Sequence, residues 1–374
     1  ENNVFATLPV IIFDDFTTST KYVNFKFKVK SSAMKILAPS SEEVNVKYVY
    51  YHMQTIRHNV DTHKRYWISI FSKLNIAIAP LPEQRAIVAK IEESFSKLDS
   101  GIESLKKAKE QLEIYRQAVL KAAFEGKLTR KWREKNICTE MQNEWMRRKL
   151  GDVCDKVEKI NKKNLDKHKQ FFYIDIGSID NEIYKIISHK VYKWEDAPSR
   201  AQQIIKIGDV LFSTVRTYLK NIAQVTDSIH NNQICSSGFT VIRGIEKLLD
   251  PKFIFYFTIY EGFLQPLNKL QTGSSYPAVR DKDVFEQIIP LPLLKEQNQI
   301  VQEIESRLSV CENIEANIEE ALEKAEALRQ SILKKAFEGK LLSKEVLEAC
   351  RQEDDWEPAA ELLKRIKEDN KEVN

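Results

Sequence analysis

The sequence predicts an α+β protein in which two β-rich globular blocks, the first of them short, alternate with two long helices that pair as an antiparallel coiled coil. Two observations predict this fold. A long segment occurs twice, and each copy has the apolar spacing of an amphipathic helix. The residues before each copy contain short β-like runs bounded by turn residues. Only ten glycines among 374 residues also favour long helices over a glycine-rich nucleotide-binding enzyme.

The repeat is clearest where each copy ends, with KAAFEGKL at residues 121–128 and KKAFEGKL at residues 334–341. The offset between the copies, measured from Gly126 to Gly339, is 213 positions. Without any gap, 20 of the 46 positions from 83 to 128 are identical to the positions at this offset in the second copy. Chance does not produce identity of this extent, so the chain contains two copies of one unit.

Each copy predicts one long helix. Pro82 and Pro292 lie at or just before its start, and Gly126 and Gly339 follow its last apolar position, as expected of a left-handed cap. The apolar positions with 4-3 spacing are Ile91, Phe95, Leu98, Ile102, Leu105, Leu112 and Val119 in the first copy, and Ile304, Leu308, Cys311, Ile318, Leu322, Ala325 and Ile332 in the second. A helix of roughly 65–70 Å with one narrow stripe needs a partner. With a large block between them, the two copies can pair only antiparallel.

Polar side chains interrupt the stripe at Lys109, Arg116, Glu315 and Arg329. One interpretation makes them solvated positions at the rim of the helix pair. The other uses the internal symmetry: if Ile102 lies near Leu322, the equivalent pairing places Lys109 near Glu315, and this pair of opposite charges favours one register over a slipped one.

The block before the second helix predicts strands at residues 171–176, 209–213, 221–225 and 239–242, followed by a buried helix at 253–260. The first block predicts strands at 10–13 and 25–29 and a helix from residue 46. It has only 80 residues, so internal comparison indicates that about 60–70 residues of a full block are absent.

The predicted division of the chain is a first block at 1–80, a helix at 81–129, a linker at 130–144, a second block at 145–291, a helix at 292–341 and a tail at 342–374. In the tail, Leu362, Leu363 and Ile366 predict a short amphipathic helix, which packs on a partner or near the first long helix.

The sequence contains none of the motifs that carry common chemistry. There is no P-loop, G-x-G-x-x-G, H-E-x-x-H, G-x-S-x-G or Asn-Pro-Pro-aromatic segment. Histidines at 52, 58 and 63 lack a matching acidic pattern, so packing explains them better than a metal site. Residues 180–185 resemble a nuclease carboxylate–lysine set only weakly. We therefore expect no catalysis, no metal and no cofactor.

The charge distribution and the cysteines bear on nucleic-acid binding and on the compartment of the protein. The net charge of +4 is uneven, with +4 in residues 1–80, +2 in 81–144, +5 in 145–292 and −7 in 293–374. A modest basic excess permits nucleic-acid binding without requiring it. The five scattered cysteines, the lack of a signal peptide and the lack of a long apolar run predict a cytoplasmic protein without a disulfide framework or membrane segment.

Two polar loops of the second block are candidates for nucleic-acid contacts. STVRTYLK at 213–220 combines cations, an aromatic ring and hydroxyl groups beside a strand end, and QTGSSYP at 271–277 has little side-chain bulk and many donors. Phosphate contacts need cations and backbone N–H groups, and base contacts need Arg, Asn, Gln, Ser or Thr. Loops of this composition are also common as solvated turns.

Taken together, these residues resemble the specificity subunit of type I restriction–modification enzymes over essentially the full chain. The most specific features are the two helices, each with Glu-Gln near its start (83–84 and 296–297) and AFEGKL at its end. GDVLFSTVR at 208–216, GSSYP at 273–277 and PVIIFDDFTT at 9–18 are similar to the family's target recognition domains. The first copy departs from the second at residues 77–79, with Ala-Ile-Ala where the second has Pro-Leu-Pro.

The resemblance implies a subunit that catalyses nothing and reads a bipartite site on double-stranded DNA, with the helix pair setting the separation of the half-sites. It implies two methyltransferase subunits and two restriction (motor-nuclease) subunits as partners. The candidate DNA-binding residues are Arg216, Thr217, Tyr218, Lys220, Ser274, Ser275 and Tyr276 in the second domain, and Thr17, Thr18, Lys21 and Arg65 in the first. The alternative function is a coiled-coil scaffold whose globular domains bind proteins.

Overall fold

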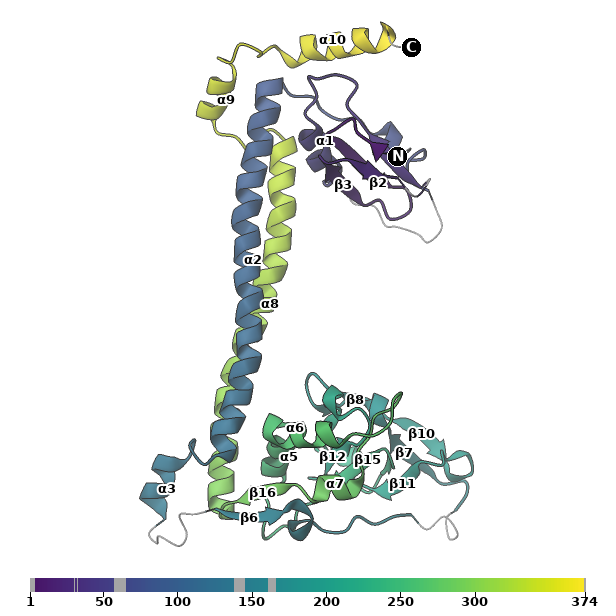
Figure 1. The fold of residues 1–374 in the computed structure, drawn as a ribbon, viewed down its shortest axis with the longest axis vertical. Coiled ribbons are helices and arrows are strands. Elements are labelled where there is room, and N and C mark those ends of the chain that lie inside the picture. The colour runs from purple at the N-terminus through teal and green to yellow at the C-terminus, as the bar shows by residue number, and fades with distance from the viewer. Residues whose placement is uncertain are drawn as a thin grey trace. The chain divides into compact units, whose positions relative to one another are not determined.

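The computed structural model describes residues 4–29, 31, 33–56, 65–137, 145–160 and 166–372 (Figure 1). The chain forms two compact units: unit 1 comprises residues 1–108 and 317–374, and unit 2 comprises residues 109–316. The two long helices, α2 (Leu81–Phe124) and α8 (Leu294–Phe337), each have 44 residues and contribute one segment to each unit. None of the helices in the described ranges is long and apolar enough to cross a bilayer.

Both long helices end in the same glycine cap. Gly126 has φ +72° and Gly339 has φ +71°, the left-handed conformation that costs glycine least. The next amide in each copy reaches back across the cap, with Lys127 N–H donating to the Ala122 carbonyl over 2.9 Å and Lys340 N–H to the Lys335 carbonyl over 2.8 Å. The predicted glycine caps are therefore confirmed.

In unit 1 the segments of α2 and α8 pack antiparallel. Their shared core contains Ile87, Val88, Ile91 and Phe95 from α2 and Leu333 and Ala336 from α8. Further along α2, Asp99 pairs with Arg329, whose guanidinium carbon lies 4.4 Å from the centre of the Phe95 ring. Rising residue numbers on α2 thus meet falling numbers on α8, as the sequence predicts.

In unit 2 the same two helices pack antiparallel again, and one acid is paired with two cations. The Glu315 carboxylate lies 3.3 Å from Lys109 Nζ and 2.6 Å from Arg116 Nη2. The Arg116 hydrogen bond, with further help from Lys109, lowers the pKa of Glu315 despite its partial burial. The predicted pair of Lys109 and Glu315 is confirmed, and with the Lys109 side chain still 44% exposed the pair also lies at the rim of the helix pair. The contact to Arg116 was not predicted.

The globular part of unit 1 is a three-stranded antiparallel sheet with a helix against it. β2 (Val10–Asp14) lies between β3 (Thr20–Val23) and β5 (Met34–Leu37), and α1 (Val46–Met53) packs on them. The strand expected at 25–29 was wrong in extent. It is confined to β4 (Phe27–Lys28), paired with β1 (Val4–Phe5), while β3 forms the edge of the main sheet. Phe25 is 57% exposed, so the alternating pattern there has no core to face.

The globular part of unit 2 contains the predicted strands and several that the sequence did not reveal. β7 (Gln170–Ile174), β12 (Val210–Ser213), β13 (Ile222–Gln224) and β15 (Phe239–Ile242) match the four predicted runs, and α5 (Pro251–Ile259) matches the predicted helix. The elements that were not predicted are α3 (Arg130–Asn136), β6 (Met146–Lys149), β8 (Ile179–Asp180), β9 (Lys185–Ile186), β10 (Lys190–Lys193), β11 (Ala201–Ile204), β14 (Ile234–Ser236), α6 (Glu261–Leu270), α7 (Asp281–Phe285) and β16 (Ile288–Leu291). The protein is α+β, as predicted.

The central sheets of the two units have the same plan. The order β13-β12-β15 in unit 2 repeats the order β3-β2-β5 in unit 1, all pairs are antiparallel, and each sheet is followed by an aromatic-rich helix, α5 or α1. In unit 2, β16 also pairs with β6. No described strand pairs with residues 75–78, which correspond to β16 at the offset of the repeat. The duplication therefore extends from the long helices into the sheets.

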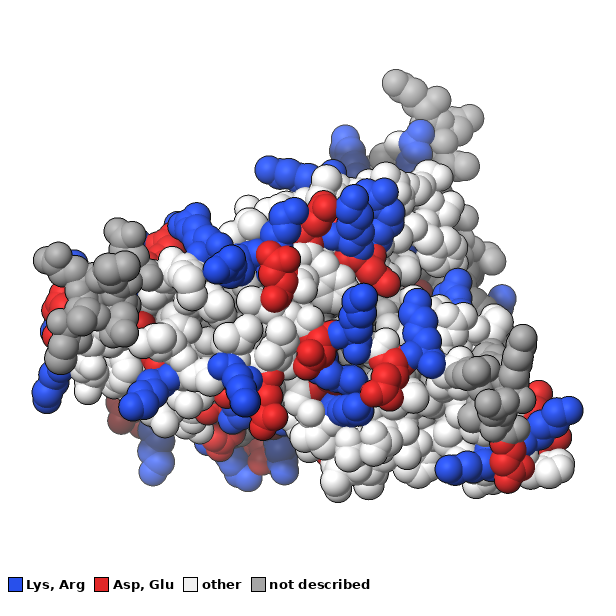
Figure 2. Space-filling model, turned by 90° about the horizontal axis from the view of Figure 1, so that it is seen from below, with Lys and Arg blue, Asp and Glu red and all other residues white. Residues whose placement is uncertain are grey.

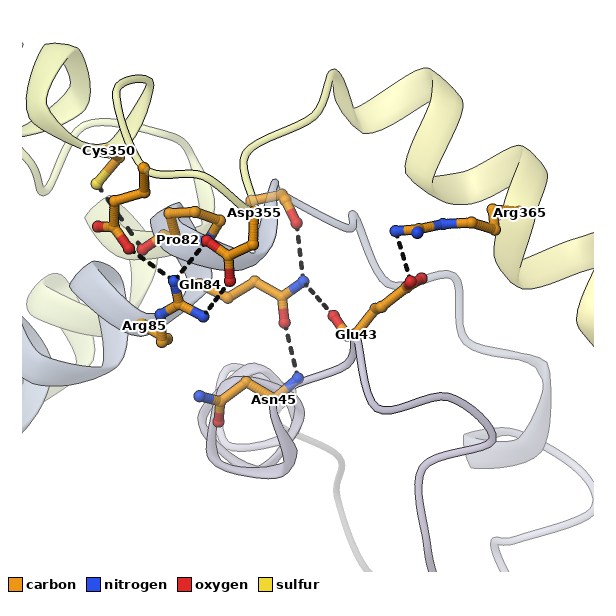
Figure 3. A network of polar contacts seen from close by, with 10 residues as sticks. Glu43, Asn45, Pro82, Gln84, Arg85, Cys350, Asp355 and Arg365 are labelled. Carbon is orange, nitrogen blue, oxygen red and sulfur yellow. Dashed lines mark hydrogen bonds and ion pairs between the residues drawn. The ribbon is translucent and has the colours of Figure 1, made fainter.

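The C-terminal tail of unit 1 forms α9 (Lys344–Cys350) and α10 (Ala359–Glu372). Of the predicted apolar positions on α10, Leu362 and Ile366 are buried and Leu363 is 40% exposed. Arg85 at the start of α2 pairs with Glu353 and Asp355 between the two tail helices, and Arg365 on α10 pairs with Glu43 (Figure 3). Within unit 1 this helix thus contacts Glu43, and the segment before it contacts the start of the first long helix, while packing of the helix on a partner stays a prediction.

Candidate nucleic-acid interface

Two loops of unit 2 lie side by side at one end of the three-stranded sheet. We call residues 214–221, between β12 and β13, the hairpin loop of unit 2, and residues 271–280, between α6 and α7, its late loop. Arg216 N–H donates to the Pro277 carbonyl over 2.7 Å, Val279 N–H donates to the Thr214 carbonyl over 3.0 Å, and Val215 and Ala278 form an isolated β-bridge. Backbone bonds thus fix the two loops, predicted separately from the sequence, as one surface.

Arg216 is held in an unusual conformation on this surface. Its φ of +49° is left-handed, a conformation that residues other than glycine adopt uncommonly. Its guanidinium carbon lies 4.8 Å from the centre of the Tyr276 ring, and Nη2 donates to the Ser275 carbonyl over 3.1 Å. The buried Nε has no hydrogen-bond partner among the described residues. The structure therefore brings together three of the predicted residues, with the Tyr276 ring 71% exposed.

The other predicted residues of the hairpin loop have different roles. Thr217 is buried, and its hydroxyl bonds Asn268 and Gln271, so its side chain holds the loop together rather than facing outward. Lys220 forms a 2.5 Å ion pair with Glu261. Burial alone would lower the pKa of Lys220, but the Glu261 carboxylate outweighs it and the pKa is raised. Tyr218 and Ser274 are exposed and available to a ligand.

Unit 1 has a corresponding pair of segments. Residues 15–19 form the hairpin loop of unit 1, between β2 and β3, and residues 65–70 form its late segment. The buried Asp15 joins them, because its carboxylate accepts the amides of Tyr66 and Trp67 over 2.8 and 2.7 Å. Arg65 lies with its guanidinium carbon 5.5 Å from the centre of the Phe16 ring. Sequence reasoning missed both Asp15 and Phe16, since neither has a local signal for its role.

The remaining candidates of unit 1 are spread over the hairpin. Thr17 is exposed in the loop, and its amide donates to Asp14. Thr18 is half-buried with φ +58°, and Lys21 is exposed on β3. The structure therefore gathers Thr17, Thr18 and Lys21 on one hairpin and leaves Arg65 on the neighbouring segment.

A buried glutamine attaches each globular part to its long helix. In unit 1 the fully buried Gln84 accepts the Asn45 amide over 2.8 Å and donates to the Glu43 and Ala79 carbonyls over 3.1 and 2.8 Å (Figure 3). Asn45 itself caps α1 by accepting the amides of Lys47 and Tyr48. The glutamine thus joins the start of α2 to the start of α1.

Unit 2 repeats this arrangement. Gln297, also fully buried, accepts the Asp250 amide and donates to the Leu248 and Pro292 carbonyls, each over 2.8 Å, and Asp250 caps α5. The sequence showed the repeated Glu-Gln pair but not its role. The two glutamines hold each sheet and its loops in a defined place beside the long helices of the same unit.

The glutamate of the repeated Glu-Gln dipeptide accepts a hydrogen bond from a tryptophan in each unit. Glu296, 1% exposed, accepts from Thr129 Oγ1 and Arg133 Nε over 2.8 Å and from Trp145 Nε1 over 3.0 Å. Glu83 accepts from Trp356 Nε1 over 3.3 Å. The segment after each long helix is thereby tied to the start of the other long helix within the same unit.

Charge is not segregated on the face drawn in Figure 2, where Lys and Arg side chains are interspersed with Asp and Glu. Within the described ranges no cluster of three or more His, Cys, Asp or Glu side chains could hold a metal ion. His58 and His63 of the predicted histidine set lie outside those ranges. The four described cysteines, Cys154, Cys235, Cys311 and Cys350, are unpaired, and Cys311 is buried on the apolar stripe of α8.

The structure defines a protein built from a repeat, in which a duplicated sheet is carried on two long helices and each unit has a pair of joined loops with an arginine beside an aromatic ring. Residues 142–324 match the family model described as the type I restriction modification DNA specificity domain. The chain is 26% identical over 315 residues to the type I restriction enzyme EcoDI specificity subunit of Escherichia coli, covering 79% of this chain and 68% of that protein. It is 25% identical over 317 residues to the EcoKI specificity subunit of Escherichia coli strain K12, covering 79% and 64%. The chain is therefore similar to the specificity subunits of type I restriction–modification systems, and residues 142–324 match their DNA specificity domain.

A solved structure, the HsdS subunit from Thermoanaerobacter tengcongensis, is 39% identical to this chain with a TM-score of 0.45. The match covers 49% of this chain and 47% of that one. The chain therefore spans about two thirds of the curated relatives it matches and about half of this solved chain.

Proposed function

We propose that this chain is the DNA-reading subunit of a type I restriction–modification complex and catalyses no reaction itself. Each unit reads one half of a bipartite target on double-stranded DNA through its hairpin loop and the adjoining late loop or segment. The observation that carries the proposal is the repetition of one sheet plan with an arginine–aromatic pair beside the equivalent hairpin loop in both units. Two different DNA-contacting units on one chain suit an asymmetric, two-part site.

The long helices support the second part of the proposal, a fixed separation between the half-sites. Buried glutamines attach each globular part to the helices, and opposite charges at Glu315 set the register of the helix pair in unit 2. The methyltransferase and restriction subunits, two of each, dock on this chain and supply catalysis and much of the phosphate neutralisation. A net charge of only +4 is then sufficient.

The test is binding of the chain, assembled with its methyltransferase, to a library of random duplexes, followed by sequencing of the bound fraction. We expect two enriched blocks separated by a constant gap. Arg216→Ala should weaken binding to the selected duplex far more than to random DNA, because an arginine that reads a base contributes little on other sequences. An equal loss on both would assign Arg216 to a phosphate. Failure to enrich any sequence, together with capture of a protein partner by the globular parts, would favour the coiled-coil scaffold instead.

A further inference from the structure

The two arginine–aromatic pairs lie at equivalent places in the two units. In unit 1 the Tyr66 amide donates to the Asp15 carbonyl over 3.0 Å, and in unit 2 the Val279 amide donates to the Thr214 carbonyl over the same distance. Tyr66 and Val279 are separated by 213 positions, the offset of the repeat. The hairpin loops and the late segments of the two units are therefore joined at matching backbone positions.

This match aligns the residues around each pair. Phe16, next to Asp15, corresponds to Val215, and Arg65, next to Tyr66, corresponds to Ala278, which bridges Val215. In unit 2 the arginine–aromatic pair is one residue further along the hairpin, at Arg216. The segments that supply the arginine and the aromatic ring are exchanged between the two units. The hairpin supplies the cation in unit 2 and the ring in unit 1, while the later segment supplies the ring in unit 2 and the cation in unit 1.

The physical properties of the pairs suit a contact surface. Among the residues that the structure describes, neither Arg65 nor Arg216 forms an ion pair with an acidic side chain, whereas Lys35 lies 4.0 Å from Asp15 and Lys220 pairs with Glu261. A ring under a guanidinium restricts its motion without using its hydrogen-bond donors, although in Arg216 the neighbouring Ser275 carbonyl accepts from Nη2. Phe16 is 39% exposed and Tyr276 71% exposed, so each ring lies at the surface beside its arginine.

We propose that Arg65 supported by Phe16 is the specificity-determining pair of unit 1, the counterpart of Arg216 supported by Tyr276 in unit 2. Each arginine contacts a base edge of its own half-site, and each ring positions the guanidinium. This inference rests on the proposed DNA-reading function. It adds Phe16 and Tyr276 as positioning residues and assigns the two arginines to different halves of the target.

The experiment uses the full chain assembled with its methyltransferase and the same random-duplex selection, read as base preference at every position. Arg65→Ala and Phe16→Ala should each relax the preference at positions of one block only, with Arg65→Ala reducing discrimination about 10- to 100-fold. Arg216→Ala and Tyr276→Ala should relax positions of the other block only. Arg65→Lys preserves the charge and the fold but not the planar fork, so it should keep affinity for random DNA and lose discrimination. Arg351→Ala, an exposed cation on the tail, is the matched control and should leave both blocks unchanged.

The outcomes distinguish failure of the assigned arginine–aromatic pair from failure of the proposed DNA-reading function. If the wild-type complex selects two blocks but Arg65→Ala and Arg65→Lys leave both intact, the assignment of the unit 1 pair is overturned and DNA reading stands. If Arg65→Ala weakens all duplexes equally, Arg65 contacts phosphate and the assignment is also overturned. If the wild-type complex selects no sequence, the proposed function itself fails.

Discussion

Replacement of Gln297 by leucine tests how each globular part is held to its long helix. Leucine is close to glutamine in size, so the change removes polar contacts without leaving a large cavity. Three hydrogen bonds of 2.8 Å are lost, and the Asp250 amide and the Leu248 and Pro292 carbonyls remain in a site where the glutamine is 0% exposed. Each buried backbone group without a partner costs about 1 kcal/mol or more, so we expect unit 2 to lose about 3–5 kcal/mol of unfolding free energy.

The assay combines denaturant unfolding with native-state hydrogen exchange, because two units in one chain need not unfold together. The Asp250 amide should exchange much faster in Gln297→Leu, while the Asn45 amide in unit 1 keeps its wild-type rate. Gln84→Leu should give the reverse pattern. Gln302→Leu, an exposed position on the same helix as Gln297, should change neither amide.

A loss of less than about 1 kcal/mol in Gln297→Leu, equal to that of the control, would refute this reasoning. It would mean that water or a small movement of the loop satisfies the three backbone groups at little cost. The attachment of the sheet would then depend on apolar packing around α5 and not on the glutamine.

Two further predictions concern buried or half-buried carboxylates. The pKa of Glu315 is lowered by Arg116, so its ion pairs stabilise the fold above the ordinary carboxyl pKa and this stability is lost as the pH falls through the lowered value. Glu315→Gln should therefore cost about 1 kcal/mol at pH 7 and much less at pH 3 in thermal unfolding; an equal difference at both pH values would contradict this account. Glu296→Ala should destabilise unit 2 by about 3 kcal/mol, because Arg133 stays mostly buried without its acid. Altered Trp145 fluorescence should accompany the loss, and an unchanged unfolding curve would show that Arg133 finds another partner.

Much of the architecture follows from patterns within the sequence. The constant offset between the two copies revealed the duplication, the 4-3 apolar spacing revealed α2 and α8, and the glycines at 126 and 339 marked their ends. These signals are local or repeat themselves, so they can be read without knowing which parts of the chain meet. The pairing of Lys109 with Glu315 followed from the repeat as well, because symmetry relates one contact to another.

The candidate site was predictable in part. The loops around Arg216 and Tyr276 were identified from their composition, but the role of Thr217 was not, because its burial depends on Asn268 and Gln271 from another segment. Strands as short as β8 and β9 were also missed. So short a run shows little periodicity, and its stability comes from its neighbours.

The sequence by itself determined the duplicated plan, the α+β class and the resemblance to a family, because these depend on repeated patterns along the chain. Tertiary structure alone decided which backbone groups the glutamines at 84 and 297 satisfy, and that Arg65 lies over Phe16, 49 positions earlier in the chain. Such contacts join residues that are remote in sequence, and their energies exist only once the backbone has brought those residues within a few ångströms. The sequence pattern therefore specifies the helices and sheets, and the packed structure specifies which side chains lie together on the loops.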